Sequence, residues 1–309
     1  MADKPTAVIA EPPVPLRERA PIVSKPPTAR SQALLPFIAA AVLLAAWQIL
    51  AQVFSLPIYI APTPMQVART LVSELPTLMR NFVPTALESL VGFIVGNTIA
   101  ILVAVVFVHS RRLEAALYPI AVFVNTIPIL AKAPILVLIF GLGMTSKVVI
   151  AAFICFFPTL ANMVRGLTSV NPQSLELMRV LSASKAEVFW KLRVPSSLPF
   201  LFSALKIAST TSVLGAIVGE WIGADLGLGA LIIEATHNFR SPLLYATVFV
   251  SSAWAVVFFA VVSFAERRIV TWKQGEVSGW RRRRSRTRRA RRRSSTGATC
   301  SWWVAVRPA

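Results

Sequence analysis

The sequence predicts an all-α fold, a polytopic membrane bundle of about six transmembrane helices, on three observations. First, 55% of the 309 residues are hydrophobic and 15% are charged, whereas soluble domains carry about 25% charged residues. Second, the apolar runs have the length of about 20 residues that a helix needs to cross a bilayer core. Third, lysine and arginine concentrate in alternate connecting segments, which is the pattern of a multi-pass protein.

Residues 1–33 come before the first long apolar run. They contain seven prolines, mixed charges and no stretch that could form a core, which predicts a disordered arm. The apolar run starts at Ala33, too late for a signal peptide, and no small-residue cleavage site follows it.

Six apolar segments within residues 34–272 have the composition of membrane spans. They cover residues 34–54, 85–108, 113–131 with a proline-broken continuation to 141, 148–167, 198–220 and 242–265. Pro119, Pro128 and Pro134 interrupt the third segment. A broken helix at membrane depth is tolerated where protein or a wet cavity covers the freed backbone groups. Residues 34–272 are therefore predicted to form one transmembrane domain.

The basic residues predict the orientation of this domain. Segments on the side of the two termini carry 15 lysines and arginines, against 4 on the opposite side, even without the arginines of residues 277–309. By the positive-inside rule, both termini lie in the cytoplasm.

Residues 273–309 form a basic tail that is predicted to be disordered. Residues 277–309 hold eleven arginines and no acids, which could bind anionic lipid or nucleic acid through charge. The basic run lacks interleaved aromatic residues, so we do not expect a nucleic-acid partner. An alternative is that a reading-frame shift near Gly275 produced a tail without a function.

The predicted cytoplasmic loop between the fourth and fifth spans is the most informative segment. Asn171 followed by Pro172 is typical of an N-cap with a first-turn proline. They open a predicted helix in which Leu175, Met178 and Leu181 recur at three-residue spacing.

A second short helix is predicted after a turn at residues 182–184. Ser184 and Glu187 form a capping box, Glu187 and Lys191 form an i,i+4 pair, and Pro195 is expected to end the helix. The two helices expose more apolar surface than a connector needs, which favours a soluble partner. The alternative is that they pack beneath their own bundle.

This loop resembles the cytoplasmic signature of ABC-importer permeases, which reads Glu-Ala-Ala, three residues, Gly, nine residues, Ile, any residue, Leu-Pro. Here the frame is Glu176, Leu177, Met178, then Ser182, then Leu192, Arg193, Val194 and Pro195. The spacing is kept, but larger residues replace the alanines and a serine replaces the glycine. The segments TALESLVGF, IPILAKAPILVLIFGLG and GEWIGADLGLGALI resemble the nitrate, sulfonate, taurine and pyrimidine-precursor branch of these type I permeases. The resemblance covers residues 34–272.

The resemblance implies a bacterial inner-membrane permease that works as a pair of subunits, expected to be a homodimer in membrane lipid. Each subunit would dock the helices at 172–194 on a separate ABC ATPase subunit, and an extracytoplasmic solute-binding protein would deliver the solute. ATP closure of the ATPase would switch the access of the pathway. The implied docking residues are Glu176, Leu177, Met178, Leu181, Ser182, Ala183, Phe189, Leu192 and Pro195. The resemblance also implies that the segment from Gly223 to Leu231 forms an outer gate.

No cofactor or catalyst is predicted for the chain itself, so we do not expect an enzyme. The two histidines and two cysteines are isolated, so no metal site is expected. The segment GLGMTSK lacks the Gly-Lys pair of a phosphate loop, so ATP must bind to the partner subunit.

Ionisable residues within the predicted spans are candidates for the solute pathway because a charge in lipid is costly. Lys132, between two helix-breaking prolines, is expected to face a wet cavity with Asn125 and Thr126 and would suit an anionic solute. Glu220 and Trp221 could offer an acceptor and a stacking face to a heteroaromatic solute. Glu88, Lys206 and Glu220 could instead snorkel to the interface.

Glycines at four-residue spacing predict close helix packing, at Gly92 and Gly96 and again at Gly215, Gly219, Gly223 and Gly227. Together these features predict a permease subunit of an ATP-driven importer for a small polar or anionic organic solute. The alternative is a secondary transporter or channel driven by an ion gradient. That class often shows two similar halves and midplane acids, which the sequence lacks.

Overall fold

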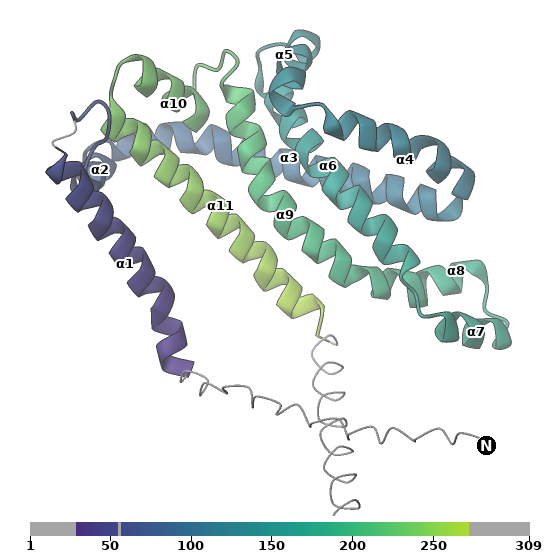
Figure 1. Ribbon diagram of the computed structural model, residues 1–309. Helices are drawn as coiled ribbons and strands as arrows, with labels where there is room; N and C mark the ends of the chain where they lie inside the picture. The colour runs from purple at the N-terminus through teal and green to yellow at the C-terminus, as the bar shows by residue number, and fades with distance from the viewer. Residues whose placement is uncertain (1–28, 55–56, 272–309) are drawn as a thin grey trace, which may run out of the picture.

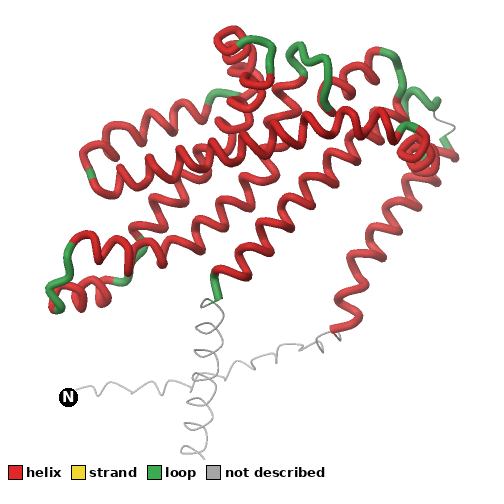
Figure 2. Tube along the Cα trace, turned by 180° about the vertical axis from the view of Figure 1, so that it is seen from behind, coloured by secondary structure: helices red, strands yellow, loops and turns green. Residues whose placement is uncertain are grey.

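The computed structural model describes residues 29–54 and 57–271, and all the regular structure in that part of the chain is helical (Figures 1 and 2). The predicted arm at 1–33 lies mostly outside the described residues, and the predicted tail at 273–309 lies entirely outside them. Four long helices pack together as the bundle: α3 (Leu75–His109), α6 (Met144–Thr168), α9 (Val194–Glu220) and α11 (Ser241–Ile269). A fifth, α1 (Ala29–Val53), lies beside them and contacts mainly α2. The shorter elements are α2 (Pro64–Ser73), α4 (Arg111–Thr126), α5 (Ile129–Phe140), α7 (Pro172–Val180), α8 (Lys185–Val188), the π-helical turn η1 (Phe189–Arg193) and α10 (Leu228–His237).

The described residues contain four or five of the six spans that the sequence predicts. Four helices are long and apolar enough to cross a membrane: α3, α6, the continuous helix Lys185–Glu220, and α11. The pair α4 and α5 passes the same test together but bends by 102° between them, where the broken third span is predicted. In α1 the described apolar stretch, Ile38–Val53, is shorter than a full span. Six crossings therefore remain a prediction.

The two ends of the bundle carry different elements. The helices α7 and α8 lie at one end, where α1 also begins and α11 also ends (Figure 1). We call α7, α8 and η1 the foot. The helices α5 and α10 lie at the opposite end, which we call the head end (Figure 1).

The centre of the bundle is held by close contact of α6 with α3 and α9. A Cβ atom added at Gly92 would lie 2.5 Å from Ala151 Cβ, and one at Gly215 would lie 2.7 Å from Ala151 Cα. At Gly96 the added atom would collide with the backbone of Ala152. The predicted role of these three glycines in helix packing is confirmed, because any larger residue would push the helices apart. For Gly223 and Gly227 the prediction is wrong, because they lie after the end of α9 with φ of +77° and +135°.

The predicted end of the second foot helix at Pro195 is wrong. The chain is helical without interruption from Lys185 to Glu220. The Val194 N–H donates to the Phe189 carbonyl, which is the wider register of a π turn. This turn lies directly before Pro195, which has no N–H to donate, so the proline is accommodated within the first turn of α9.

Candidate functional site

The caps of the foot are confirmed as predicted. The Asn171 side chain accepts from the Gln173 N–H at 3.0 Å and begins α7. Ser184 and Glu187 form a reciprocal capping box, with N···O distances of 3.0 and 3.2 Å. Lys191 Nζ lies 2.9 Å from Glu187 Oε1. Each of these interactions joins near neighbours in the sequence, so the helix caps of the foot need no partner from the rest of the bundle.

The turn between α7 and α8 depends on Ser182, which has a φ of +52°. Glycine adopts this left-handed conformation most easily. The turn is closed by the Ser182 N–H, which donates to the Arg179 carbonyl at 2.9 Å, and by the Ala183 N–H, which donates to the Met178 carbonyl at 3.0 Å. A serine therefore holds the tight turn at the position where the family signature has glycine.

The foot exposes large apolar side chains. The exposed fractions are 60% for Leu177, 81% for Val180, 67% for Leu181 and 68% for Trp190. Val180 and Trp190 are absent from the residues that the sequence analysis selects. Val180 could have been found, because it follows Leu177 by three residues and shares its helix face.

The remaining predicted docking residues differ in exposure, and Phe189 differs most. Phe189 is buried in a cluster with Phe107 and Leu160, and its ring centroid lies 4.9 Å from that of His109. It therefore anchors the foot to α3 and α6 and does not contribute to an exposed surface. Glu176 and Ser182 are exposed, whereas the half-buried residues are Met178, Ala183, Leu192 and Pro195.

At the head end, the first turn of α10 is held by side chains of two other helices. Three consecutive N–H groups donate to them: Gly227 to Asn81 Oδ1 at 3.0 Å, Leu228 to Thr85 Oγ1 at 2.8 Å and Gly229 to Glu220 Oε2 at 2.6 Å. The Thr85 hydroxyl also lies 2.6 Å from Glu220 Oε1, to which it donates. We call Asn81, Thr85 and Glu220 the clamp residues.

Next to the clamp residues lies a buried ion pair that the sequence analysis did not identify. Lys147 Nζ is 3.3 Å from Glu88 Oε1, and the two residues are 8% and 2% exposed. Within the described part of the chain, the buried Glu88 Oε2 has no hydrogen-bond partner. The prediction that Glu88 and Glu220 snorkel to the interface is wrong, because both are buried among helices and Glu220 is only 1% exposed. Lys206 instead pairs with Glu266 of α11 at 2.7 Å.

The ion pair lines a cavity of about 550 Å³, which we call the head cavity. Its walls come from α3, from the start of α6 and from residues 221–227, which we call the head loop. Asp225 of the head loop is the third charged residue in the lining.

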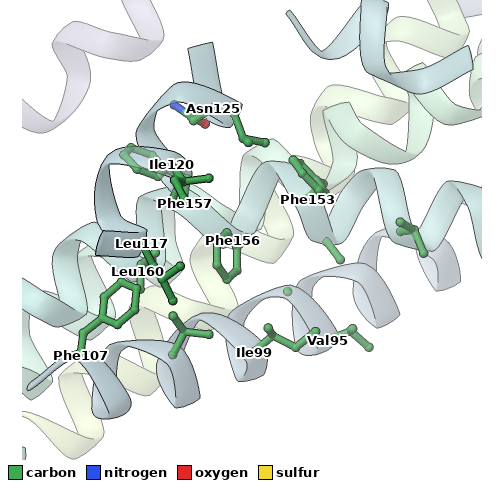
Figure 3. Close-up of a pocket in the computed structure, with 16 residues that line it drawn as sticks. Val95, Ile99, Phe107, Leu117, Ile120, Asn125, Phe153, Phe156, Phe157 and Leu160 are labelled. Carbon is green, nitrogen blue, oxygen red and sulfur yellow. The ribbon is translucent and has the colours of Figure 1, made fainter. Parts of the chain in front are cut away.

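A second cavity, of about 490 Å³, lies between α3, α4 and α6 and is almost entirely apolar (Figure 3). Phe153, Phe156 and Phe157 of α6 line it together with aliphatic residues such as Ile99 and Ile120 (Figure 3). Asn125 is the one polar side chain among its described lining residues.

The five predicted solute-pathway residues lie in two separate places. Asn125, Thr126 and Lys132 lie at the bend between α4 and α5, whereas Glu220 and Trp221 lie at the head end of α9. Trp221 is 41% exposed. Thr126 donates to the Phe123 carbonyl at 2.6 Å.

The Lys132 ammonium stabilises the bend. Its Nζ donates to the Val124 carbonyl at 3.0 Å and lies 5.0 Å from the centroid of the Phe153 ring. The helical partner of that carbonyl would be residue 128, and Pro128 has no N–H. Lys132 therefore satisfies a backbone group that the proline leaves free. Among residues 29–54 and 57–271, no three His, Cys, Asp or Glu side chains are placed to hold a metal ion.

Comparison with known proteins gives consistent matches. Residues 96–271 match the family described as "Binding-protein-dependent transport system inner membrane component". The chain is 34% identical over 244 residues to the formylaminopyrimidine transport permease protein ThiX of Halalkalibacterium halodurans, covering 79% of this chain and 97% of that protein. It is 30% identical over 233 residues to the riboflavin transport system permease protein RibX of Chloroflexus aurantiacus, covering 75% and 87%.

A solved structure shares the fold. It is described as an amino acid ABC transporter with histidines, and it aligns with a TM-score of 0.54 at 19% identity. The alignment covers 65% of this chain and 97% of that chain.

Proposed function

This chain belongs to the family of binding-protein-dependent transport system inner membrane components, and on that premise we propose that its foot couples an ATPase to alternating access of a solute pathway. The chain is a multi-pass permease component of an ABC importer and not an enzyme, because the ATPase of such importers is a separate subunit. This membership goes against the alternative of a transporter or channel driven by an ion gradient.

The exposed apolar surface of the foot is the observation that carries the proposal. Leu177, Val180, Leu181 and Trp190 are all at least 60% exposed. Exposed apolar patches of this kind mark interaction sites. The caps of the foot are local, so it can insert into a groove on the ATPase as a preformed unit. ATP binding would close two ATPase subunits and bring two feet together.

The helix that begins in the foot supports transmission of this movement. Lys185–Glu220 is one helix of 36 residues. At about 1.5 Å per residue it extends roughly 54 Å, from the foot to the clamp residues. A displacement of the foot can therefore reach the head end through a single rigid element.

We propose the following assembly around the chain. Two copies form a homodimer in membrane lipid, the foot and both termini face the cytoplasm, and a solute-binding protein docks at the head end. ATP binds to the ATPase partner, and this chain holds no cofactor.

The solute is proposed to be a small polar or anionic organic molecule. The names of the two relatives refer to a formylaminopyrimidine and to riboflavin, which favours a polar heterocycle. The proposed pathway residues remain Asn125, Thr126, Lys132, Glu220 and Trp221. Asn125 has the strongest support, because it is the polar side chain of an aromatic cavity.

Capture of the ATPase tests the proposal. A tagged chain purified from membranes of its host should retain an ATPase subunit, detected by ATP hydrolysis in the eluate. The double variant Leu177→Glu/Leu181→Glu should retain at most about a tenth of that ATPase activity, because charges on the docking surface oppose its burial against the ATPase. Val72→Glu is the matched control, since Val72 is 78% exposed on α2, away from the foot. Equal ATPase capture by the double variant and the wild type would refute the docking role.

A further inference from the structure

The clamp residues join three helices at one point. Asn81 and Thr85 lie one turn apart on α3, Glu220 is the last residue of α9, and their partners are the first N–H groups of α10. The first N–H groups of a helix have no partner within the helix and carry partial positive charge. A carboxylate in contact with them forms a charge-assisted hydrogen bond. The N-cap residue of α10 is Gly227, which has no side chain that could cap the helix. The clamp residues take this role instead.

The fit of α10 on Glu220 is tight. A Cβ atom at Gly227 would collide with the Glu220 carboxylate, and one at Gly229 would lie 2.9 Å from its Oε2. Gly227 also has a φ of +135°, which excludes most other residues. The head loop starts directly after Glu220 and returns to it at Gly227. The loop therefore begins and ends at Glu220: it follows Glu220 in the chain, and its last residue, Gly227, packs against the Glu220 carboxylate while its N–H donates to Asn81 Oδ1.

The head loop is one wall of the head cavity. Gly223, Asp225 and Leu226 line the cavity together with Glu88 and Lys147. The ion pair is buried, and Glu88 keeps one oxygen without a partner in the described part of the chain. Movement of the loop would therefore open a polar cavity in which Glu88 Oε2 can accept a hydrogen bond from a solute.

We propose that Asn81, Thr85 and Glu220 are positioning residues that hold the head loop closed over the head cavity, and that release of the first turn of α10 opens this cavity to solute. The hydrogen bonds are suited to this role because their donors and acceptors lie on different helices. A hydrogen bond weakens steeply once the N···O distance exceeds about 3.2 Å. A shift of α9 relative to α3 of about an ångström therefore releases the first turn of α10. The entry of solute and the link to ATP hydrolysis rest on the proposed function, whereas the clamp itself does not.

Hydrogen exchange of the purified chain tests the clamp itself. Thr85→Val keeps the side-chain volume but removes both the acceptor of the Leu228 N–H and the donor to Glu220. The peptide spanning residues 221–231 should exchange at least tenfold faster in this variant, and Thr85→Ser should restore slow exchange. Thr247→Val is the matched control, since Thr247 is equally buried but bonds only within α11. Unchanged exchange in Thr85→Val would overturn the proposal.

ATP hydrolysis by the full transporter tests whether the clamp controls access. Without the solute-binding protein, Thr85→Val should raise basal hydrolysis several-fold over the wild type, because a released head loop removes a barrier to the outward-open state. Thr85→Ser and Thr247→Val should stay at the wild-type rate. Faster exchange with unchanged hydrolysis would overturn the gating role. If no ATPase associates with the wild-type chain, the proposed function fails, while the exchange result still decides whether the clamp exists.

Discussion

The foot and the head end both contain short helices whose first turn is capped by side chains, but the caps come from different distances along the chain. In the foot, donor and acceptor are two or three residues apart at Asn171 and Ser184. At α10 they are 146 and 143 residues apart for Asn81 and Thr85. The two ends also differ in burial, since the foot exposes Leu181 whereas Glu220 is enclosed.

The two kinds of cap imply different behaviour of the two ends during transport. A locally capped helix keeps its structure when the surrounding helices move, so the foot can be displaced as a unit. A helix capped by remote residues keeps its position only while those residues keep their arrangement. The position of the first turn of α10 therefore depends on the packing of α3 against α9. The caps of the foot do not, although Phe189 anchors the foot to α3 and α6.

The largest effect is expected at the head end, from Lys147→Met. This variant leaves the buried Glu88 without its counter-charge, so the free energy of unfolding should fall by about 3–5 kcal/mol. Thermal unfolding of the purified chain in detergent measures the loss. Glu88→Gln added to this variant should recover most of the stability, and a wild-type transition temperature for Lys147→Met alone would show that the pair contributes nothing.

The next effect separates the inner side of the foot from its exposed side. Phe189→Ala should cost about 3 kcal/mol, because the ring is buried against α3 and α6. Trp190→Ala should cost less, about 1 kcal/mol, since the side chain is 68% exposed and loses only its edge-to-face contact with the Phe189 ring. The same unfolding assay compares the two variants. Equal losses would mean that Trp190 also belongs to the core.

Removal of a local cap should have a smaller effect. Ser184→Ala should lower stability by about 1 kcal/mol, because the Glu187 N–H loses its acceptor. Ser252→Ala serves as the comparison, since Ser252 is exposed and bonds within α11. Hydrogen exchange of residues 184–193 measures the change in helix stability of the foot. Exchange that rises equally at α10 would contradict the independence of the two ends.

The smallest expected effect is an increase in stability. Ser182→Gly should raise the free energy of unfolding by about 0.5 kcal/mol, because glycine relieves the positive φ but adds freedom to the unfolded chain. A loss of stability in the unfolding assay would indicate that the serine hydroxyl contributes to the turn.

Local features of the chain were predictable because their causes lie within a few residues. The cap at Asn171, the capping box of Ser184 and Glu187, and the glycine pair on α3 were all identified from spacing. The break near Pro128 was also predicted, because proline cannot donate a backbone hydrogen bond. The prediction at Pro195 was wrong because a single π turn shifts the register of hydrogen bonds, and no sequence pattern signals that turn.

The sequence by itself determined that the chain is a helical membrane protein, where its apolar segments lie and how its foot is capped. Hydrophobicity, proline and capping act over short stretches of chain, and they operate whatever the rest of the molecule does. Only the tertiary structure decided that Glu88 pairs with Lys147, that Phe189 turns inward, and that α10 is capped from two other helices. These interactions join residues far apart in the sequence, so they depend on how the long helices pack.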